Sequence, residues 1–176
     1  MRRQLVLTLA MSGLLALPAA AAVPMLTVDG MAGVRIGMTV EEAEKVTGPL
    51  TVTYPNDDGG CGEAVPANGW IPGASLMVEG RRIVRIDIAQ GPPTGPEVMG
   101  STDTGIGIHD SIAGAKRVYG KRLRIQPDPY GNAERRRLVV KGHKPGREII
   151  FETFRGRVTS FRAGLSRQVE YIEGCS

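Results

Sequence analysis

The chain has 176 residues, of which 41% are hydrophobic, 23% charged and 5% aromatic, with 22 Lys and Arg against 18 Asp and Glu. These proportions are those of an ordinary soluble globular protein. A chain of this length buries about two thirds of its unfolded surface, as one domain or two small ones. It is too short for most cofactor enzymes, so we expect no cofactor.

Residues 1–22 have the three parts of a secretory signal peptide. Two arginines precede an apolar run at residues 5–17, and Ala20 and Ala22 supply the small residues of an A-x-A cleavage site. The apolar run is too short to span about 30 Å of hydrocarbon. We therefore expect cleavage after Ala22 and a mature protein that is periplasmic or secreted and has no stable membrane anchor.

The segment from Gly33 to Gly48 predicts a short amphipathic helix. Thr39 is an N-cap residue, and Glu42 three places later completes a capping box. Apolar residues at every third position give one buried stripe, and a glycine ends the helix. The stripe consists of Val40, Ala43 and Val46. A helix of about nine residues is marginal alone, so it must pack on another element.

The single tryptophan lies in a loop of glycine and proline turns at residues 68–73. Tryptophan is enriched among interface hot spots, so Trp70 and its neighbour Ile71 are candidate partner-binding residues. The alternative is that both side chains cap the core of the first sheet. Tyr54 and Tyr130, each next to a proline, are candidates by the same reasoning.

A β-hairpin and a linker follow this loop. Residues 76–78 and 83–88 predict two antiparallel strands joined by a turn at Glu79 and Gly80. Period-two alternation places Val84, Ile86 and Ile88 on one face. The Gly and Pro residues at 91–96 predict a linker at the centre of the mature chain.

Residues 105–120 repeat the pattern of residues 33–48 without gaps, 72 positions further along the chain. Ser111 stands at the N-cap position, and a glycine again ends the helix. The second apolar stripe consists of Ile112, Ala115 and Val118. This agreement predicts that one ancestral module has been copied.

Strands also follow the second helix. They are predicted at residues 138–141, 148–152 and 158–161, with a final strand at 169–172. The expected fold class is therefore α+β, with two tandem repeats that each pack a short helical segment on an antiparallel sheet. The first repeat comprises residues 23–100 and the second residues 101–176.

Cys61 and Cys175 are the only cysteines, and an even count in an exported chain predicts a disulfide. This bridge would tie the loop before the first hairpin to the C-terminus. The alternative, a reactive thiol, lacks support because the chain has no CxxC pair and neither cysteine has a histidine beside it.

Charge is distributed unevenly between the two halves. Residues 23–100 hold 5 basic and 10 acidic side chains, whereas residues 101–176 hold 15 and 8. The basic residues of the second half could meet an anionic partner or form a solvated face. They include Lys116, Arg117, Lys121, Arg122, Arg124, Arg135, Arg136 and Arg137. No aromatic-interleaved basic stripe is present, so nucleic acid is not an expected partner.

Catalytic and metal-binding motifs are weak. His109, Asp110 and Ser111 are the residue types of a hydrolytic triad, but neighbours at a helix start point in different directions, and Ser111 is explained as a cap. Two histidines and one disulfide leave too few ligands for zinc. Asp57 and Asp58 lack the alternating carboxylates of an EF-hand loop, so a polar turn is expected. We predict no catalytic, cofactor-binding or metal-binding residue.

The duplicated pattern Gly-x-x-x-Gly-Met-Thr-x-x-Glu-Ala, followed by a hairpin, resembles the repeat of the β-lactamase inhibitor proteins and of the SmpA/OmlA outer-membrane assembly lipoproteins. Gly33, Gly37, Met38, Thr39, Glu42 and Ala43 carry it, and Gly105, Asp110, Ser111 and Ala115 carry it more weakly. The resemblance implies a helical segment on a four-stranded sheet and protein binding without catalysis. Unlike the assembly lipoproteins, this chain has no lipid-anchoring cysteine.

These observations predict an exported, non-enzymatic module that binds an unidentified envelope or extracellular protein through its sheet face or the groove between the repeats. One alternative is an envelope assembly or structural factor of the same fold. A second is a small hydrolase that uses Asp110 or Glu152 between the repeats, which would need a convergent set of titratable groups there.

Overall fold

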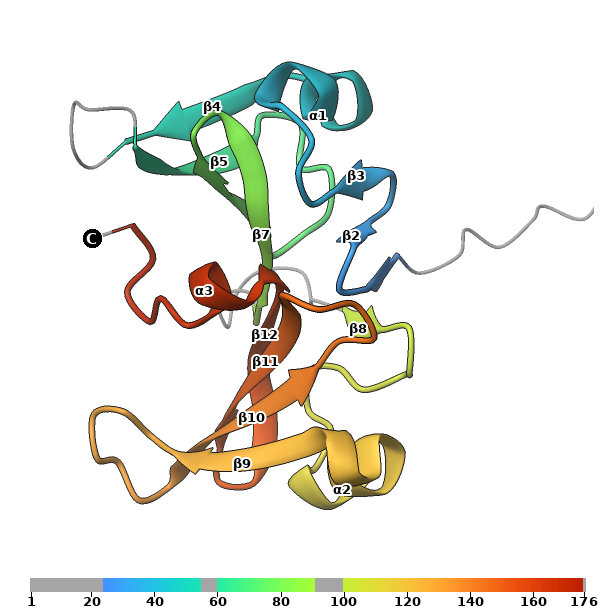
Figure 1. Ribbon diagram of the computed structural model, residues 1–176, viewed down its shortest axis with the longest axis vertical. Coiled ribbons are helices and arrows are strands. Elements are labelled where there is room, and N and C mark those ends of the chain that lie inside the picture. The colour runs from blue at the N-terminus through green and yellow to red at the C-terminus, as the bar shows by residue number, and fades with distance from the viewer. Residues whose placement is uncertain (1–23, 55–59, 91–99, 176) are drawn as a thin grey trace, which may run out of the picture.

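The computed structural model describes residues 24–54, 60–90 and 100–175 (Figure 1). The predicted signal peptide, the acidic pair Asp57 and Asp58 and the predicted linker at 91–96 lie outside the described residues. The fold is α+β, with a mostly antiparallel eight-stranded sheet and few helices.

The sheet has the strand order β4-β5-β6-β7-β12-β11-β10-β9, and its neighbouring strands are antiparallel. Its strands are β4 (Leu50–Thr53), β5 (Cys61–Pro66), β6 (Ala74–Glu79), β7 (Arg82–Ala89), β9 (Leu123–Pro127), β10 (Arg135–Lys141), β11 (Arg147–Phe154) and β12 (Arg157–Leu165). β7 and β12 meet at the centre, where Ile88 lies opposite Phe161. One continuous sheet therefore joins the two halves of the chain (Figure 1).

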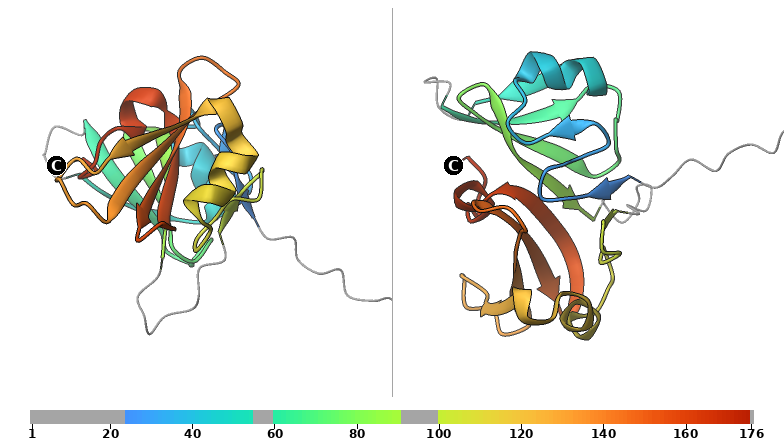
Figure 2. Two further views of the ribbon diagram at one scale, coloured as in Figure 1. Left: turned by 90° about the horizontal axis from the view of Figure 1, so that it is seen from below. Right: turned by 45° about the vertical axis from the view of Figure 1, so that its right-hand side comes forward.

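Two helices and four short strands cover one face of the sheet, which we call the core face. Helices α1 (Val40–Thr47) and α2 (Ile112–Tyr119) lie at opposite ends of this face, and a 3-10 turn, η1 (Gly120–Arg122), follows α2 (Figures 1 and 2). The short strands are β1 (Met25–Leu26), β2 (Gly30–Met31), β3 (Val34–Arg35) and β8 (Ser101–Thr102). β1 pairs with β8 in parallel, so the start of the described chain contacts the second half.

Both predicted helices are confirmed, together with their caps. The Thr39 hydroxyl accepts a hydrogen bond from the backbone N–H of Glu42, and the Glu42 carboxylate accepts one from that of Thr39. In α2 the Ser111 hydroxyl accepts from the backbone N–H of Gly114 at 3.0 Å. These side chains satisfy donors that the first turn of a helix leaves unpaired.

The predicted third members of the two apolar stripes are wrong. Val46 is 40% exposed and Val118 is 42% exposed, whereas the next residues, Thr47 and Tyr119, are buried. A helix turns once every 3.6 residues, so the buried face runs through positions spaced three and then four apart. Ala43 and Ala115 are fully buried as predicted, because small side chains let the helices approach the sheet.

The hairpin in the first half differs in detail from its prediction. A β-bulge lies between the pairs Met77–Arg85 and Val78–Ile83, so that Val84 is the extra residue. As a result Ile83, rather than Val84, joins Ile86 and Ile88 in the main core. Strands β4, β5 and β9 were not predicted, because their alternation is short and interrupted by polar residues and prolines.

The predicted strand at 169–172 is wrong, because a short helix, α3 (Ser166–Val169), and a turn occupy this region. The segment crosses the sheet face opposite the core face, which we call the second face. It has no strand edge to pair with there, since the two edges of the sheet are β4 and β9. Instead Val169 packs with Val139 and Ile150 in a small second core.

The pairing of β7 with β12 requires glycine at position 164. A Cβ atom at Gly164 would lie 2.3 Å from the carbonyl oxygen of Val84 and 2.8 Å from Cα of Arg85. We expect Gly164→Ala to lower the free energy of unfolding by about 1–3 kcal/mol, because the central strands must separate.

Gly114→Ala is a matched control for this prediction. The nearest atom to its new Cβ would be the Ser111 hydroxyl oxygen at 3.4 Å. Alanine is favoured over glycine in a helix by about 0.5–1 kcal/mol, so this variant should keep or gain stability. Chemical denaturation measures both, and equal effects of the two substitutions would contradict the role of the central strand pair.

Candidate functional site

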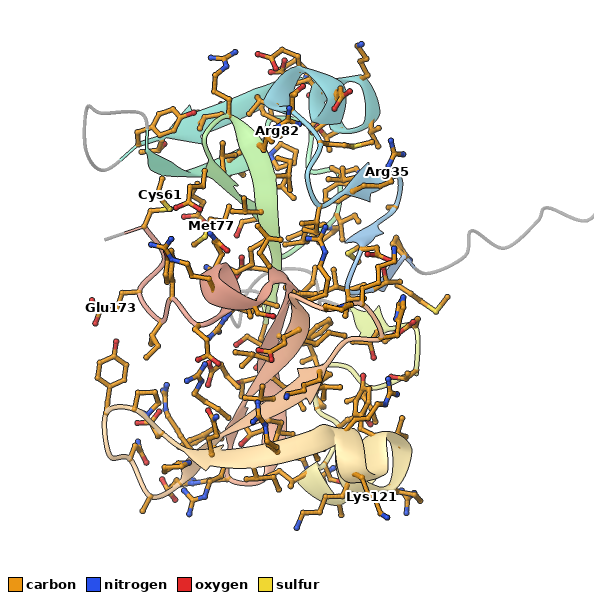
Figure 3. All side chains as sticks on the ribbon, in the orientation of Figure 1. Arg35, Cys61, Met77, Arg82, Lys121 and Glu173 are labelled. Atoms are coloured by element: carbon orange, nitrogen blue, oxygen red, sulfur yellow. A yellow bond between two sulfur atoms is a disulfide. The ribbon has the colours of Figure 1, made fainter. Side chains whose placement is uncertain are left out.

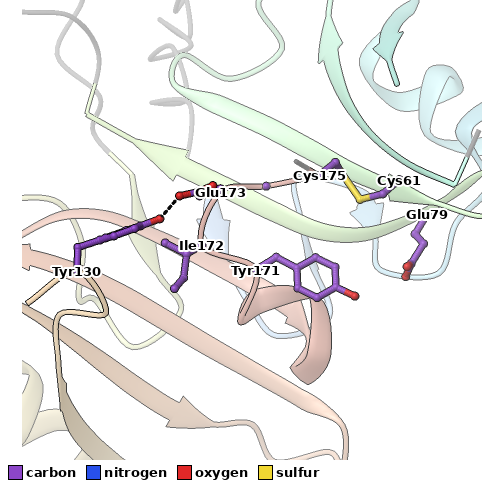
Figure 4. A pocket seen from close by; sticks show the side chains of 8 residues that line it. Cys61, Glu79, Tyr130, Tyr171, Ile172, Glu173 and Cys175 are labelled. Atoms are coloured by element: carbon purple, nitrogen blue, oxygen red, sulfur yellow. Dashed lines mark hydrogen bonds between the residues drawn. A yellow bond between two sulfur atoms is a disulfide. The ribbon is translucent and has the colours of Figure 1, made fainter. Parts of the chain in front are cut away.

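A groove of about 420 Å³ lies between the C-terminal segment and the loop that joins β9 to β10 (Figure 4). We call it the C-terminal groove. It is lined by Cys61, Glu79, Tyr130, Tyr171, Ile172, Glu173, Gly174 and Cys175. Tyr130 and Glu173 lie at one end, and Tyr171, Glu79 and the disulfide lie at the other. The lining therefore combines aromatic rings, an aliphatic side chain and two carboxylates.

The loop that carries Tyr130 is held by a buried carboxylate. Asp128 is 8% exposed, and its Oδ2 accepts hydrogen bonds from the backbone N–H groups of Tyr130 and Asn132, each at 3.1 Å. The Asn132 side chain in turn accepts from the backbone N–H of Glu134. Such side-chain to backbone bonds fix a turn without regular secondary structure. The loop thus presents Tyr130 in a defined position.

Tyr130 is 64% exposed, yet its hydroxyl is held by the C-terminal segment. The phenol donates a hydrogen bond to the Glu173 carboxylate (Figure 4). This bond raises the pKa of Tyr130 above its ordinary value, because it stabilises the protonated phenol beside a negative charge. The contact joins two loops that are 43 residues apart in sequence.

Buried arginines hold the C-terminal segment on the second face: Arg137 of β10 pairs with Glu170 at 2.6 Å, and two others bind backbone carbonyls. Arg85 of β7 donates through Nη1 to the carbonyl oxygens of Gln168 and Tyr171, at 2.8 and 2.9 Å. Arg162 of β12 donates through Nε to the carbonyl oxygen of Val169 at 2.6 Å. These guanidiniums bind carbonyl groups at and just beyond the end of a short helix, where few backbone N–H donors are available.

Carboxylates compensate the buried cations. Arg85 pairs with Asp87 at 2.8 Å, and Arg162 pairs with Glu152 at 3.0 Å. Burial raises the pKa of Asp87, and the charge of Arg85 opposes this effect. Burial also lowers the pKa of Arg162, which the Glu152 carboxylate counteracts. Buried charges must be paired in this way, so these groups fix the position of the C-terminal segment.

The disulfide predicted from the sequence is confirmed. Cys61 on β5 and Cys175 in the C-terminal segment are bonded, with Cα atoms 5.4 Å apart and a sequence separation of 114. The bridge forms one wall of the C-terminal groove. The Gln168 side-chain amide donates a hydrogen bond to the Glu79 carboxylate. This bond fixes the position of Glu79, which lines the groove beside the disulfide.

The four residues predicted to bind a partner lie in three different places in the structure. Trp70 and Ile71 are partly buried and pack against the main core. The Tyr54 ring lies over Gly62 of β5, where a Cβ atom would approach it to 2.7 Å. Only Tyr130 among these four lines the C-terminal groove.

Five groove residues were not predicted: Glu79, Tyr171, Ile172, Glu173 and Gly174. Their signal in the sequence is weak, because Tyr171 and Ile172 fall in the predicted final strand and Glu173 and Gly174 follow it directly. The predicted disulfide was the one feature that placed the C-terminus near the first half of the chain.

The residues considered for hydrolysis have structural partners on different elements. Asp110 accepts a hydrogen bond from the backbone N–H of Gly107 at 2.8 Å, which shapes the turn before α2. Glu152 pairs with Arg162 on the second face. Among the residues that the structure describes, no group of three or more His, Cys, Asp or Glu side chains could hold a metal ion.

Comparison with models of known protein families, with curated proteins and with solved structures finds no match for this chain. Within the described ranges, no helix has both the length and the apolar character needed to cross a membrane.

Removal of the disulfide should free the C-terminal segment. A loop closed over more than 100 residues contributes about 4–5 kcal/mol in the chain-entropy model, so Cys61→Ala/Cys175→Ala should lower the unfolding free energy by up to this amount. We expect amide hydrogen exchange to accelerate first in residues 170–175 while β10 and β11 stay protected. Unchanged stability together with unchanged exchange would show that the arginine contacts alone hold the segment.

The hydrogen bond between Tyr130 and Glu173 should make the stability of the protein depend on pH in the alkaline range. Since the folded-state pKa of Tyr130 is raised, its contribution to stability is complete below the ordinary tyrosine pKa and is lost as the pH rises through the raised value. Glu173→Gln should shift the Tyr130 pKa down towards its ordinary value. Absorbance titration measures this, with Tyr130→Phe identifying the Tyr130 signal. An identical titration of Glu173→Gln and the unmodified protein would rule out the contact.

Proposed function

We propose that the protein is an exported, non-enzymatic protein-binding module that receives a side chain of its partner in the C-terminal groove. The observation that carries this proposal is the exposed Tyr130 ring: Asp128 holds its backbone within the loop, and Glu173 accepts a hydrogen bond from its hydroxyl. Tyrosine supplies a large contact area at low entropic cost, and preorganised aromatic side chains are typical of binding hot spots.

The charge of the groove favours a basic side chain of the partner. Glu79 and Glu173 supply two carboxylates, and among the residues that the structure describes no lysine, arginine or histidine lines the groove. Arg167 already lies over the Tyr171 ring at 6.0 Å, which leaves Tyr130 as the aromatic group for a new cation. A lysine or arginine would place its aliphatic stem against Ile172 and its charge near the carboxylates.

We further propose that the chain consists of two tandem repeats, as in the families that its sequence pattern resembles. The support is that α1 and α2 each have 8 residues, a Thr or Ser N-cap and a glycine C-cap. Four consecutive antiparallel strands of the large sheet belong to each half, β4–β7 and β9–β12. In this proposal the disulfide links the end of the second repeat covalently to the first repeat.

Export is supported by the disulfide, because disulfides persist in oxidising compartments outside the cytoplasm. An envelope assembly factor of the same fold is the main alternative. It would co-fractionate with outer-membrane complexes, whereas a free binding module would stay in the soluble fraction until its partner is present.

Photo-crosslinking tests the groove directly. Benzoylphenylalanine at position 130 of the full chain should give a light-dependent adduct with one envelope protein, and the same group at position 46 should not. Val46 is a matched control because it is also exposed, at 40%, but lies on α1 outside the groove.

Once the partner is captured, Tyr130→Ala should weaken binding by at least about 2 kcal/mol, or roughly 30-fold. Glu173→Gln should also weaken it and reduce its dependence on salt, as expected for a basic partner residue. Adducts of equal yield from positions 130 and 46, or full affinity of Tyr130→Ala, would contradict the proposed function.

A further inference from the structure

The lower end of the molecule in Figure 1 carries an unbalanced positive charge. Residues 111–127 contain five basic side chains and no Asp or Glu. The segment forms α2, η1 and β9, and all five side chains are exposed. We call this the α2 basic surface, which consists of Lys116, Arg117, Lys121, Arg122 and Arg124 with the apolar residues Val118 and Ile125.

Most of the positive charge of this surface is not compensated: Arg124 interacts with the Glu148 carboxylate, but no salt bridge of the described residues involves the other four cations. The salt bridges of the described residues involve other cations, such as Arg85, Arg137 and Arg162 on the second face. Arg122 lies over the ring of Tyr119, 5.7 Å from its centroid, which orients the guanidinium without cancelling its charge. Five cations on 17 consecutive positions therefore produce a strong local field.

The equivalent helix of the first half has the opposite charge. α1 carries Glu41, Glu42 and Glu44 with the single cation Lys45, although its caps and buried alanine match those of α2. Helix formation alone therefore does not require basic residues at these positions. A charge on the edge strand β9 would discourage strand pairing with another molecule, which accounts for Arg124 but not for the four cations of α2 and η1.

Apolar side chains lie among the cations. Val118 is 42% exposed and Ile125 is 39% exposed. A surface that combines lysines and arginines with a few exposed aliphatic groups suits an anionic lipid membrane, where phosphate head groups meet the cations and aliphatic groups enter the interface. Nucleic acid fits less well, because the one aromatic residue of the segment, Tyr119, is buried and offers no stacking surface.

We propose that the α2 basic surface docks reversibly on membranes that contain anionic phospholipids. Figure 3 shows Lys121 at the lower end of the molecule, pointing away from the fold, while Glu173 lies on another side. The C-terminal groove thus remains accessible when this end contacts a lipid surface. The proposal does not depend on the proposed protein-binding function, because it rests on different residues.

Vesicle sedimentation tests the proposal with the full chain. The protein should bind vesicles of phosphatidylcholine mixed with an equal amount of phosphatidylglycerol, should not bind phosphatidylcholine alone, and should dissociate as salt is raised. Each basic residue near an anionic surface strengthens binding about fivefold, so Lys116→Gln/Lys121→Gln should lower the partition coefficient about 25-fold.

Arg35→Gln/Lys45→Gln is the matched control, since it removes the same charge from two exposed residues of the first half. It should keep most of the binding. Equal losses in the two variants would show that net charge alone attracts the lipid and would overturn the proposal. Absence of binding to the mixed vesicles, or retention on heparin without vesicle binding, would overturn it as well.

Discussion

Two buried guanidiniums at the centre of the sheet determine much of this structure. Arg85 and Arg162 lie on the adjacent strands β7 and β12, one from each half of the chain. A buried cation needs both a counter-ion and hydrogen-bond acceptors, and the sheet supplies only the carboxylates of Asp87 and Glu152. The remaining acceptors are backbone carbonyls of residues 168–171. The chain end is therefore drawn across the second face.

The groove is a consequence of this constraint. Since the C-terminal segment is fixed at its start by the arginines and at its end by the disulfide, residues 171–174 form a wall of defined shape. The opposite wall is the β9–β10 loop, which Asp128 orders from within. Both of these walls are loops held by side-chain to backbone hydrogen bonds, while Cys61 and Glu79 line the groove from strands β5 and β6. Binding sites on such supported loops lose little entropy when a partner is bound.

The two ends of the sheet have the same construction and different surfaces. Each is covered by an N-capped helix that buries an alanine, so the packing requirements are alike. Exposed positions of these helices are free of that requirement, and they carry acidic residues in α1 and basic residues in α2. The proposed membrane contact thus uses positions that the fold leaves unconstrained, while the proposed protein contact uses positions that the fold holds in place.

Local chemistry explains which elements the sequence predicted. Helix capping by Thr39 and Ser111 depends on neighbours a few residues away, and so do the alternating or β-branched runs of β7, β10, β11 and β12. Both helices and the central strands were therefore predictable. The bulge at Val84, the exposure of Val46 and Val118 and the helical conformation of 166–169 depend on packing against distant segments. They were predicted incorrectly or not at all.

By itself, the sequence determined the α+β class, the positions of the two helices, the Cys61–Cys175 bridge and the uneven charge of the two halves. Tertiary structure decided which of the candidate aromatic residues line a binding groove. Tyr130 meets Glu173 and Ile172 only because buried arginines turn the C-terminal segment back over the sheet, whereas Trp70 packs on the core. The desolvation of a charged group depends on every segment that covers it, including segments distant in sequence. A local sequence pattern therefore cannot predict which charges are buried.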